Sequence, residues 1–401
     1  MITPRTAQRL VARHCRPLAA VSVPIAQALG RVLAESVRAR VALPPFDNSS
    51  MDGYALAARS VAGASRARPR RLRIAGKVAA GGRPVARIAP GEACAVMTGA
   101  PLPRGADAVV PFEETRVEGD MLVISRPVPR QNYVRRRGED VRRGARVLAR
   151  GATVHAGTIA CLAALGRDRV RVVRPPRVAI VTTGDELVAP GQPLPGGAVY
   201  DSNSAMLAAM VREAGIEPRS CRRVRDRAAS VERAVAAALA RCDVLVVSGG
   251  VSVGERDCVR GAFERAGVRT VFWRVRQKPG KPLYFGVRGE QLIFGLPGNP
   301  ASAFVCFYAY VYPALRRLGG FARADLRERA TVAPGVAGDA VRWQLLRAAG
   351  KGADATVLPK QGSHIITPLA RAQSLVVVAP RAPRRARAPV LALPGREEDT
   401  S

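Results

Sequence analysis

Short apolar runs alternate with helical segments along residues 177–318, and this alternation limits the possible folds more than any other feature of the sequence. Strands are predicted at Val178–Thr182, Ser220–Val224, Val244–Val247 and Thr270–Trp273, and helices at Ser204–Ala214, Ala229–Ala240 and Val259–Ala266. A hairpin is predicted from Pro282–Val287 and Gln291–Gly295, followed by a long helix at Pro300–Leu318. Because such alternation is typical of a doubly wound, mostly parallel sheet, we expect a central three-layer α/β domain.

The flanking regions have different patterns. The first forty-odd residues are predicted to be helical, with a helix at Ile25–Ala34, and a further helix is predicted at Thr158–Leu165. Residues 46–138 are rich in glycine, proline and short alternating runs, and Glu118-Gly-Asp120 has the form of a hairpin turn. We therefore expect a multidomain α/β plus β protein. Its predicted domains are I (1–45 and 139–176, helical and linking), II (46–138, inserted and β-rich), III (177–322, α/β) and IV (323–401, small and β).

The 401-residue chain has a formal charge of +33, almost wholly from arginine, since only five residues are lysine. A basic excess is typical of nucleic-acid-binding proteins. However, aromatic residues make up only 4% of the chain, and the arginines are spread over its whole length. Because few aromatic rings are available to stack on bases, we expect no nucleic-acid partner and interpret most arginines as solvated surface residues.

Other compositional features bear on the compartment and the chemistry. No apolar run approaches the roughly 20 residues of a membrane helix, and the N-terminus lacks the layout of a signal peptide, so we expect no membrane association and a cytoplasmic location. The seven cysteines are scattered without a Cys-x-x-Cys pair, which argues against a disulfide framework or a zinc site. Only three histidines are present, which argues against a Ser-His-Asp hydrolase.

Two predicted strands end in loops suited to phosphate and metal binding. Val247-Ser-Gly-Gly250 follows one strand, and Thr182-Thr-Gly-Asp-Glu-Leu187 ends another. Glycines let the backbone approach a phosphate closely, and loops at the carboxyl ends of parallel strands open on the same rim. This arrangement would bring Glu186 and Asp257 to one site, where two carboxylates can hold Mg²⁺. The alternatives are a plain Gly-Gly turn and a carboxylate that caps the next turn.

A second group of motifs suits a small, oxygen-rich anion. Gln277-Lys-Pro-Gly-Lys-Pro282 holds two of the five lysines in one short turn, and lysine is a compact charge suited to an oxyanion. Leu296-Pro-Gly-Asn-Pro300 leads into the long helix, whose N-terminus offers free N–H groups, with Ser302 in its first turn. Arg342 and Gln361-Gly-Ser-His364 would add donors. An ordinary turn is the alternative interpretation of each motif.

The inserted domain opens with a polar loop, Pro45–Tyr54, that contains Asp47, Asn48 and Asp52. One interpretation is local Asx-turn chemistry. The other is that Asp52 reaches the α/β site of another subunit.

Read together, these motifs resemble those of the molybdopterin molybdotransferase family, the bacterial MoeA and gephyrin E-domain group. The matching strings, in family order, are PPFDNSSMDGYAL (44–56), VMTGAPLPRGADAVV (96–110), RRRGEDVRRG (135–144), TTGDEL (182–187), YDSNS (200–204), SGGVSVGERD (248–257), KPGKP (278–282), GLPGNPASA (295–303) and KQGSH (360–364). They span nearly the whole chain. Related molybdopterin-binding domains, including adenylyltransferases, share the α/β strings but lack the inserted-domain motif and the C-terminal unit.

The resemblance implies an elongated homodimer of four domains, with domain III binding molybdopterin and nucleotide. The implied reaction inserts molybdate into the dithiolene of adenylylated molybdopterin, releases AMP and yields molybdenum cofactor. Contact with other proteins of cofactor biosynthesis or with acceptor enzymes would follow. The alternatives are a molybdopterin adenylyltransferase-like enzyme and a catalytically inactive basic scaffold that binds nucleotide or RNA.

The resemblance also implies roles for individual residues. Glu186 and Asp257 would bind Mg²⁺ near the phosphates, and Ser248, Gly249, Gly250 and Ser252 would cradle the nucleotide. Lys278, Lys281, Pro297, Ser302, Arg342 and Ser363 would surround molybdate or the pterin phosphate, and Asp52, Thr98, Asp140 and Asp226 would lie in or near the active cleft. Arg274 departs from the family, which often has lysine at that position; arginine keeps the charge but changes its geometry.

Overall fold

The computed structural model describes residues 1–82, 87–250, 258–326 and 328–394. The chain divides into two compact units, each with its own core. The first unit comprises Met1–Ser22, Gly30–Ala34 and Arg171–Ser401, and the second comprises Val23–Leu29 and Glu35–Val170. The finer division into four domains stays a prediction.

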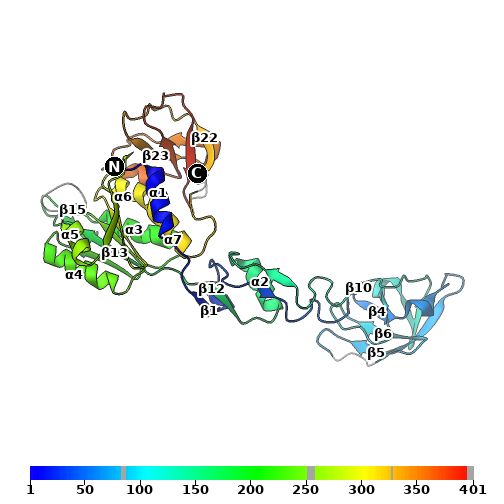
Figure 1. Ribbon diagram of the computed structural model, residues 1–401. Helices are drawn as coiled ribbons and strands as arrows, with labels where there is room; N and C mark the ends of the chain where they lie inside the picture. The colour runs from blue at the N-terminus through cyan, green and yellow to red at the C-terminus, as the bar shows by residue number, and fades with distance from the viewer. Residues whose placement is uncertain (83–86, 251–257, 327, 395–401) are drawn as a thin grey trace. The chain divides into compact units, whose positions relative to one another are not determined.

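A mixed six-stranded sheet forms the centre of the first unit (Figure 1). In spatial order its strands are β16 (Ser220–Val224), β13 (Val178–Thr183), β17 (Val244–Ser248), β21 (Gln291–Leu296), β20 (Tyr284–Arg288) and β18 (Arg269–Trp273). The first four strands run parallel, whereas β20 and β18 are antiparallel to their neighbours. Each predicted strand of this region is therefore confirmed, including the β20–β21 hairpin.

Helices cover both faces of this sheet, as the alternating sequence predicts. On one face, Ile180 of β13 packs in a core with residues of α3 (Ser202–Glu213) and α6 (Pro300–Cys306). On the other face, the next residue, Val181, packs with residues of α4 (Ala228–Leu239) and α5 (Cys258–Arg265). Because successive strand side chains point to opposite faces, the buried body of β13, Val178–Val181, is apolar at every position, and threonines appear only at its carboxyl end. The doubly wound arrangement is thus confirmed.

The register of the parallel strands aligns their carboxyl ends. Thr182 of β13 lies opposite Ser248 of β17, and Ser248 lies opposite Leu296 of β21. The three loops that follow these strands therefore leave the sheet at the same rim, which is where ligands bind in open α/β sheets.

The long helix predicted at Pro300–Leu318 is helical throughout but not uniform. A π-helical segment, Phe307–Val311, separates α6 from α7 (Tyr312–Leu318), and Gly319 and Gly320 end the run. Proline at position 313 has no N–H to donate to the preceding turn, which favours a change in hydrogen bonding at this point.

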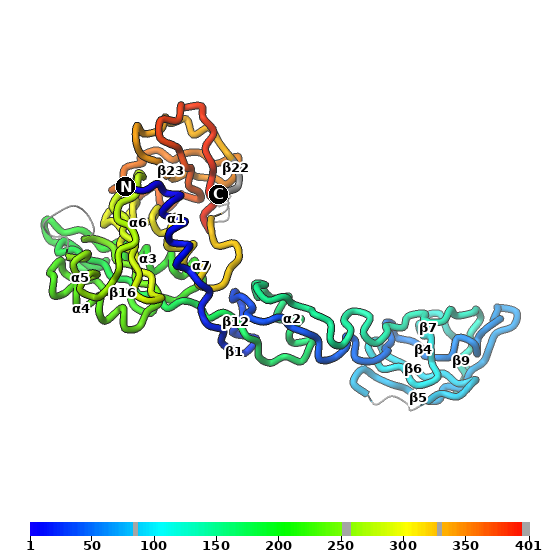
Figure 2. Tube along the Cα trace, in the orientation of Figure 1, coloured from blue at the N-terminus to red at the C-terminus, as the bar shows by residue number. Residues whose placement is uncertain are grey.

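The helix predicted at Ile25–Ala34 is wrong. Ile25–Gln27 forms a single 3₁₀ turn after β1 (Ala20–Pro24), and Gly30 adopts a positive φ of 74°. The helix of this region is instead α1 (Pro4–Arg13), which runs beside α7 in the first unit (Figure 2). Thr3 caps α1 by accepting a hydrogen bond from the Thr6 N–H at 3.2 Å, and Pro4 suits its first position.

The C-terminal residues form a second sheet, as their strand-like pattern predicts, and this sheet belongs to the first unit. Its order is β19 (Gln277–Lys278), β23 (Trp343–Ala349), β25 (Ser374–Val378), β26 (Ala388–Ala392) and β22 (Glu328–Val332), with β24 (Thr356–Val357) paired to β23. Strand β19 belongs to the Lys-Pro-Gly-Lys motif, and Lys278 lies opposite Gln344 of β23. We call residues 277–282 the lysine turn, and this pairing connects it to the C-terminal sheet.

The second unit contains a six-stranded sheet of mostly short strands. In spatial order these are β7 (Ala108–Pro111), β4 (Gly53–Leu56), β6 (Glu92–Val96), β5 (Arg70–Val78), β9 (Met121–Ile124) and β8 (Arg116–Glu118). The predicted hairpin turn at 118–120 is confirmed, since Glu118 pairs with Met121. The predicted helix near 158–165 is also confirmed as α2 (Ala156–Ala164), followed by Gly166 at a positive φ of 71°.

The remaining strands of the described residues are β2 (Val37–Arg38), β3 (Asn48–Ser49), β10 (Val134–Arg135), β11 (Arg146–Leu148), β12 (Arg169–Val173), β14 (Leu187–Val188) and β15 (Val199–Tyr200). None of the described helices combines the length and the apolar character that crossing a bilayer requires.

Candidate functional site

A pocket of about 660 Å³ opens at the carboxyl rim of the α/β sheet. We call it the rim pocket. Its walls come from the loops after β13, β17 and β21, from the start of α3 and from His364 and Ile366 in the C-terminal part of the first unit. Six of the predicted site residues line it: Glu186, Asp226, Ser248, Gly249, Gly250 and Pro297. The convergence of the TTGDEL and Ser-Gly-Gly loops on one rim is thus confirmed.

The two glycines after β17 are required by close packing. Gly249 and Gly250 have positive φ values of 97° and 60°. A Cβ atom at Gly249 would lie 2.4 Å from the Thr183 carbonyl oxygen, and one at Gly250 would lie 2.7 Å from a methyl carbon of Val259. No other residue type fits this turn without displacing the neighbouring backbone or helix α5. The turn therefore brings bare backbone to the wall of the rim pocket.

Ser248 is buried, and its hydroxyl group is engaged in the protein. It donates to the Pro297 carbonyl oxygen at 3.1 Å and accepts from Asn203 Nδ2 at 3.0 Å. Asn203 Nδ2 also donates to the Gly298 carbonyl oxygen at 2.6 Å. These bonds fix the Leu-Pro-Gly-Asn loop against the end of β17 and the first turn of α3.

Asp201 is a buried carboxylate of the YDSNS string that sequence reasoning left without a role. It caps α3 by accepting from the Ser204 N–H at 3.0 Å, and its second oxygen accepts from Thr182 Oγ1 at 2.9 Å and Ser204 Oγ at 2.6 Å. Both oxygens of Asp201 are satisfied by the protein, so this residue holds the wall of the rim pocket in place.

Neighbouring acids of the TTGDEL loop differ in their surroundings. Asp185 Oδ1 accepts from the Asp226 N–H at 3.3 Å, so Asp185 is the carboxylate that stabilises the adjoining turn. Glu186 lies against Gly184, where a Cβ would meet Glu186 Oε2 at 2.8 Å, and it lines the rim pocket with Asp226. The turn-capping alternative therefore applies to Asp185, whereas Glu186 remains available to a ligand.

Oxygen atoms suitable for Mg²⁺ line the rim pocket. The carboxylates of Glu186 and Asp226 and the buried oxygens Thr183 Oγ1 and Asn203 Oδ1 are hard ligands of the kind that this ion prefers. Asp257 and Ser252 lie outside the described residues, so the predicted pairing of Glu186 with Asp257 stays a prediction. Within the part of the chain that the structure describes, no cluster of three or more His, Cys, Asp or Glu side chains forms a metal site by itself.

A buried glutamine, Gln277, anchors the lysine turn. Gln277 Nε2 donates to the Pro279 carbonyl oxygen at 3.1 Å, and Gln277 Oε1 accepts from the Tyr310 hydroxyl group. Gly280 has a φ of 90°, and a Cβ there would lie 2.4 Å from Cys306 Sγ of α6. Lys278 and Lys281 project from this turn as exposed side chains, and the next residue, Pro282, lines the rim pocket.

The other predicted oxyanion ligands lie on the same side of the first unit. Ser302 is buried in the first turn of α6, and Ser363 Oγ accepts from Asn299 Nδ2 at 3.1 Å, with Asn299 itself lining the rim pocket. Arg342 instead forms an ion pair with Asp339 at 2.9 Å. The hydrogen bond from Arg342 and the backbone N–H groups of Val341 and Arg342 hold the pKa of Asp339 well below its usual range.

Sequence reasoning missed Arg347, the arginine that organises the Lys360–His364 segment. Arg347 is fully buried in β23 and donates to Gln361 Oε1 at 3.1 Å, to the Ile365 carbonyl at 3.2 Å and to the Lys360 carbonyl at 3.2 Å. Burial lowers the pKa of this guanidinium group. The only sequence signal is an arginine within an apolar strand upstream of the KQGSH string, and many arginines in this chain are exposed.

Three predicted cleft residues lie in the second unit. Asp52 Oδ1 accepts from the Thr98 N–H at 2.6 Å and from Thr98 Oγ1 at 2.8 Å, so the structure brings these two residues into direct contact. The backbone hydrogen bond from Thr98, followed by its hydroxyl group, lowers the pKa of Asp52. Asp140 is exposed, and its N–H donates to the Leu43 carbonyl at 3.0 Å.

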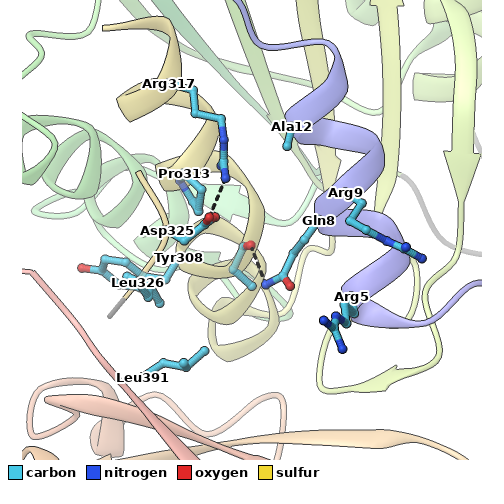
Figure 3. A pocket seen from close by; sticks show the side chains of 11 residues that line it. Arg5, Gln8, Arg9, Ala12, Tyr308, Pro313, Arg317, Asp325, Leu326 and Leu391 are labelled. Carbon is cyan, nitrogen blue, oxygen red and sulfur yellow. Dashed lines mark hydrogen bonds and ion pairs between the residues drawn. The ribbon is translucent and has the colours of Figure 1, made fainter. Parts of the chain in front are cut away.

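A smaller pocket, of about 270 Å³, lies between α1, α7 and the C-terminal residues of the first unit (Figure 3). Arg5, Gln8 and Arg9 of α1 line it together with an ion pair between Arg317 and Asp325. None of the predicted site residues lines this pocket. The rim pocket is therefore the better candidate for the functional site.

Comparison with known proteins identifies the family. The family description "MoeA N-terminal region (domain I and II)" matches residues 2–166, and "Probable molybdopterin binding domain" matches residues 179–317. Molybdopterin molybdenumtransferase 2 of Mycobacterium tuberculosis is 39% identical over 321 residues, which cover 78% of each chain. Molybdopterin molybdenumtransferase of a Nostoc species is 38% identical over 298 residues, or 73% of this chain and 68% of that protein.

A solved structure agrees with these matches. The molybdopterin biosynthesis moeA protein from Pyrococcus horikoshii superposes with a TM-score of 0.84 at 30% identity, covering 98% of this chain and 99% of that one. This overlap confirms the mixed α/β multidomain fold. The chain belongs to the MoeA family of molybdopterin molybdenumtransferases.

Proposed function

We propose that this protein is a molybdopterin molybdotransferase that inserts molybdate into the dithiolene of adenylylated molybdopterin, releases AMP and yields molybdenum cofactor. The observation that carries the proposal is the rim pocket. It combines bare glycine backbone, the carboxylates of Glu186, Asp201 and Asp226, and the start of α6, at the edge of a parallel sheet where phosphorylated ligands bind. Family membership supports the same substrate.

The nucleotide end of the substrate binds at the Ser-Gly-Gly turn in this proposal. Gly249 and Gly250 offer backbone to the phosphates, Ser252 completes the cradle, and Ser248 keeps the turn in register through its bond to Pro297. Close approach is possible because neither glycine has a side chain between the backbone and the pocket.

Glu186 and Asp257 would hold Mg²⁺, and Asp226 lines the rim pocket together with Glu186. When bound, this ion supplies charge neutralisation at the phosphoanhydride. The protein's own contribution is to fix these carboxylates: Asp185 holds the turn that carries Asp226, and Gly184 leaves room for the carboxylate of Glu186.

Molybdate binds at the lysine turn in this proposal. Molybdate and the substrate are both anions, so their approach requires nearby positive charge. Lys278 and Lys281 supply this positive charge. Pro297, Ser302 and Ser363 lie at or beside the N-terminus of α6 and complete the molybdate site. Gln277 holds the lysine turn in place. Arg342 would join this group only by exchanging its ion pair with Asp339.

We further propose that the enzyme acts as a homodimer in the cytoplasm, that Asp52, Thr98 and Asp140 serve in or near the active cleft, and that cofactor-biosynthesis proteins or acceptor enzymes take up the product. The dimer is testable by light scattering, which should give twice the 42.5 kDa mass of the chain.

The deciding experiment is incubation with adenylylated molybdopterin, Mg²⁺ and molybdate while AMP is measured. The proposal predicts AMP release that depends on molybdate and falls sharply in Glu186→Gln and Asp257→Ala, with folding checked by circular dichroism. Adenylyl transfer from ATP to molybdopterin, without molybdate-dependent AMP release, would instead show an adenylyltransferase.

A further inference from the structure

Two buried oxygen atoms at the rim pocket have no hydrogen-bond partner among the described residues. They are Asn203 Oδ1 and Thr183 Oγ1, and their residues are only 9% and 5% exposed. A buried polar atom without a partner costs free energy in the folded protein. Both residues line the rim pocket, so a bound molecule can supply the missing partners.

The orientation of the Asn203 side chain is fixed by chemistry. Its nitrogen lies 2.6 Å from the Gly298 carbonyl oxygen, which can only accept a hydrogen bond. The opposite orientation would place two acceptor oxygens in contact, so Nδ2 must face Gly298 and Oδ1 must be the atom without a partner.

The hydrogen bonds around Asn203 support the same orientation of its amide. Nδ2 donates to Ser248 Oγ at 3.0 Å, and Ser248 Oγ donates to the Pro297 carbonyl at 3.1 Å. Asn203 is not needed as the cap of α3, because Asp201 already fills that role. The Asn203 amide is therefore held in one orientation, and its oxygen, which can only accept hydrogen bonds, has no partner among the described residues.

An acceptor oxygen repels phosphate oxygens and binds N–H or O–H groups. We propose that Asn203 Oδ1, assisted by Thr183 Oγ1, accepts hydrogen bonds from a neutral N–H or O–H donor of the pterin nucleotide and so sets its orientation and selectivity. This inference rests on the proposed function. Three parts of the substrate carry such donors: the adenine amino group, the ribose hydroxyl groups and the pterin ring.

Calorimetric titration with fragments of the substrate can show which of these three parts Asn203 recognises, and whether it recognises the phosphates instead. The probes are AMP, inosine monophosphate, 2′-deoxy-AMP, 3′-deoxy-AMP, neopterin and pyrophosphate, each with Mg²⁺. Asn203→Ala also removes the hydrogen bonds from Nδ2 to Ser248 and Gly298, so pyrophosphate reports the loss that comes from the loop alone. The probe that carries the recognised donor should weaken about tenfold more than pyrophosphate does. If the donor is on AMP, the analogue that lacks it should bind wild type more weakly and lose no more than pyrophosphate in Asn203→Ala; selective loss of neopterin would assign the donor to the pterin ring.

Thr183→Val tests the inference without breaking any described bond. This change keeps the shape and removes only the unpartnered hydroxyl group, so thermal stability should stay equal or rise while affinity for the same probe falls several-fold. Asn132→Ala is the matched control for Asn203→Ala, because Asn132 Nδ2 also donates to a carbonyl, that of Val109 at 2.8 Å, but does not line the rim pocket. Its probe affinities should match wild type.

Three results would overturn the inference: equal loss of pyrophosphate and AMP, no change for any probe, or weaker binding of Mg²⁺ alone, which would make Oδ1 a metal ligand. These outcomes differ from failure of the proposed function. Wild-type protein that releases AMP with molybdate while Asn203→Ala binds every probe normally would refute only the inference.

Discussion

Buried polar groups at the two ends of strand β17 differ in whether the protein satisfies their hydrogen bonds. At the amino end, the Asp243 carboxylate accepts from Arg174 at 2.6 and 2.9 Å, from the Arg177 side chain at 3.1 Å and from the Arg177 N–H at 2.8 Å. At the carboxyl end, five residues away, Asn203 Oδ1 and Thr183 Oγ1 have no partner among the described residues. The Asp243 carboxylate is thus satisfied within the chain, whereas these two oxygens at the rim can pair with a ligand.

The electrostatics of Asp243 support this view of the amino end. Burial alone would raise its pKa, but the hydrogen bonds from Arg174 and Arg177 outweigh burial and hold the pKa well below the usual range. This carboxylate is therefore committed to stability, and nothing at this end of the strand lines the rim pocket.

The largest expected effect is on stability at the amino end. Asp243→Ala should lower the free energy of unfolding by about 3 kcal/mol, because two arginines lose a shared partner that is mostly buried. Urea denaturation measures this value, and Asp243→Asn should lose less because it keeps part of the hydrogen bonding. A loss below about 1 kcal/mol would mean that the ion pairs are worth no more than exposed ones.

The next effect concerns the glycine turn at the carboxyl end. Gly249→Ala should cost about 2 kcal/mol of stability, from backbone strain and the clash with the Thr183 carbonyl, and should abolish nucleotide binding. Gly191→Ala is the matched control, since Gly191 has a similar φ of 86° but no atom within 4 Å of an added Cβ. Equal losses of nucleotide affinity in both variants would contradict a specific role for the turn.

A change at the lysine turn should affect function alone. Lys278 is exposed, so Lys278→Ala should leave stability unchanged while the KM for molybdate rises about tenfold, with AMP affinity near wild type. Steady-state kinetics measure the first value and calorimetry the second, with exposed Lys77→Ala as the control. Parallel loss of molybdate use and AMP affinity would argue against separate anion sites.

The smallest expected effect is in the pH dependence of stability. A carboxylate with a depressed pKa in the folded state contributes stability above its unfolded pKa of about 3.9 and loses it as the pH falls below that value. The stability difference between wild type and Asp243→Asn should therefore be constant from pH 5 to 8 and shrink below about pH 4. A difference that grows on acidification would reverse the assigned sign.

Local patterns predicted much of this fold. Apolar periodicity placed β13, β17 and the β20–β21 hairpin, and the shared direction of parallel strands predicted that Glu186 and the Ser-Gly-Gly turn would meet at one rim. The exception is Ile25–Ala34, where apolar spacing suited a helix but the structure has one 3₁₀ turn followed by Gly30 in the left-handed region. Helix propensity is a weak signal where tertiary pairing competes with it.

The details of the site depend on contacts that no local pattern contains. Arg342 was predicted at the oxyanion site, but Asp339 engages it, whereas Arg347, five residues later, is the arginine that supports the Ser363 segment. The position of the unpartnered Asn203 oxygen depends on the meeting of helix α3, the end of strand β17 and the loop after β21. Such arrangements appear only when long-range packing is known.

The most direct test of the account is a crystal structure of the protein with AMP and Mg²⁺. We predict that AMP occupies the rim pocket with its phosphate at Gly249 and Gly250, and that an N–H or O–H donor, from AMP or from an ordered water that holds the place of the pterin, lies within about 3.2 Å of Asn203 Oδ1. AMP bound instead beside Arg5 and Arg9 (Figure 3), or a phosphate oxygen facing Asn203, would contradict it.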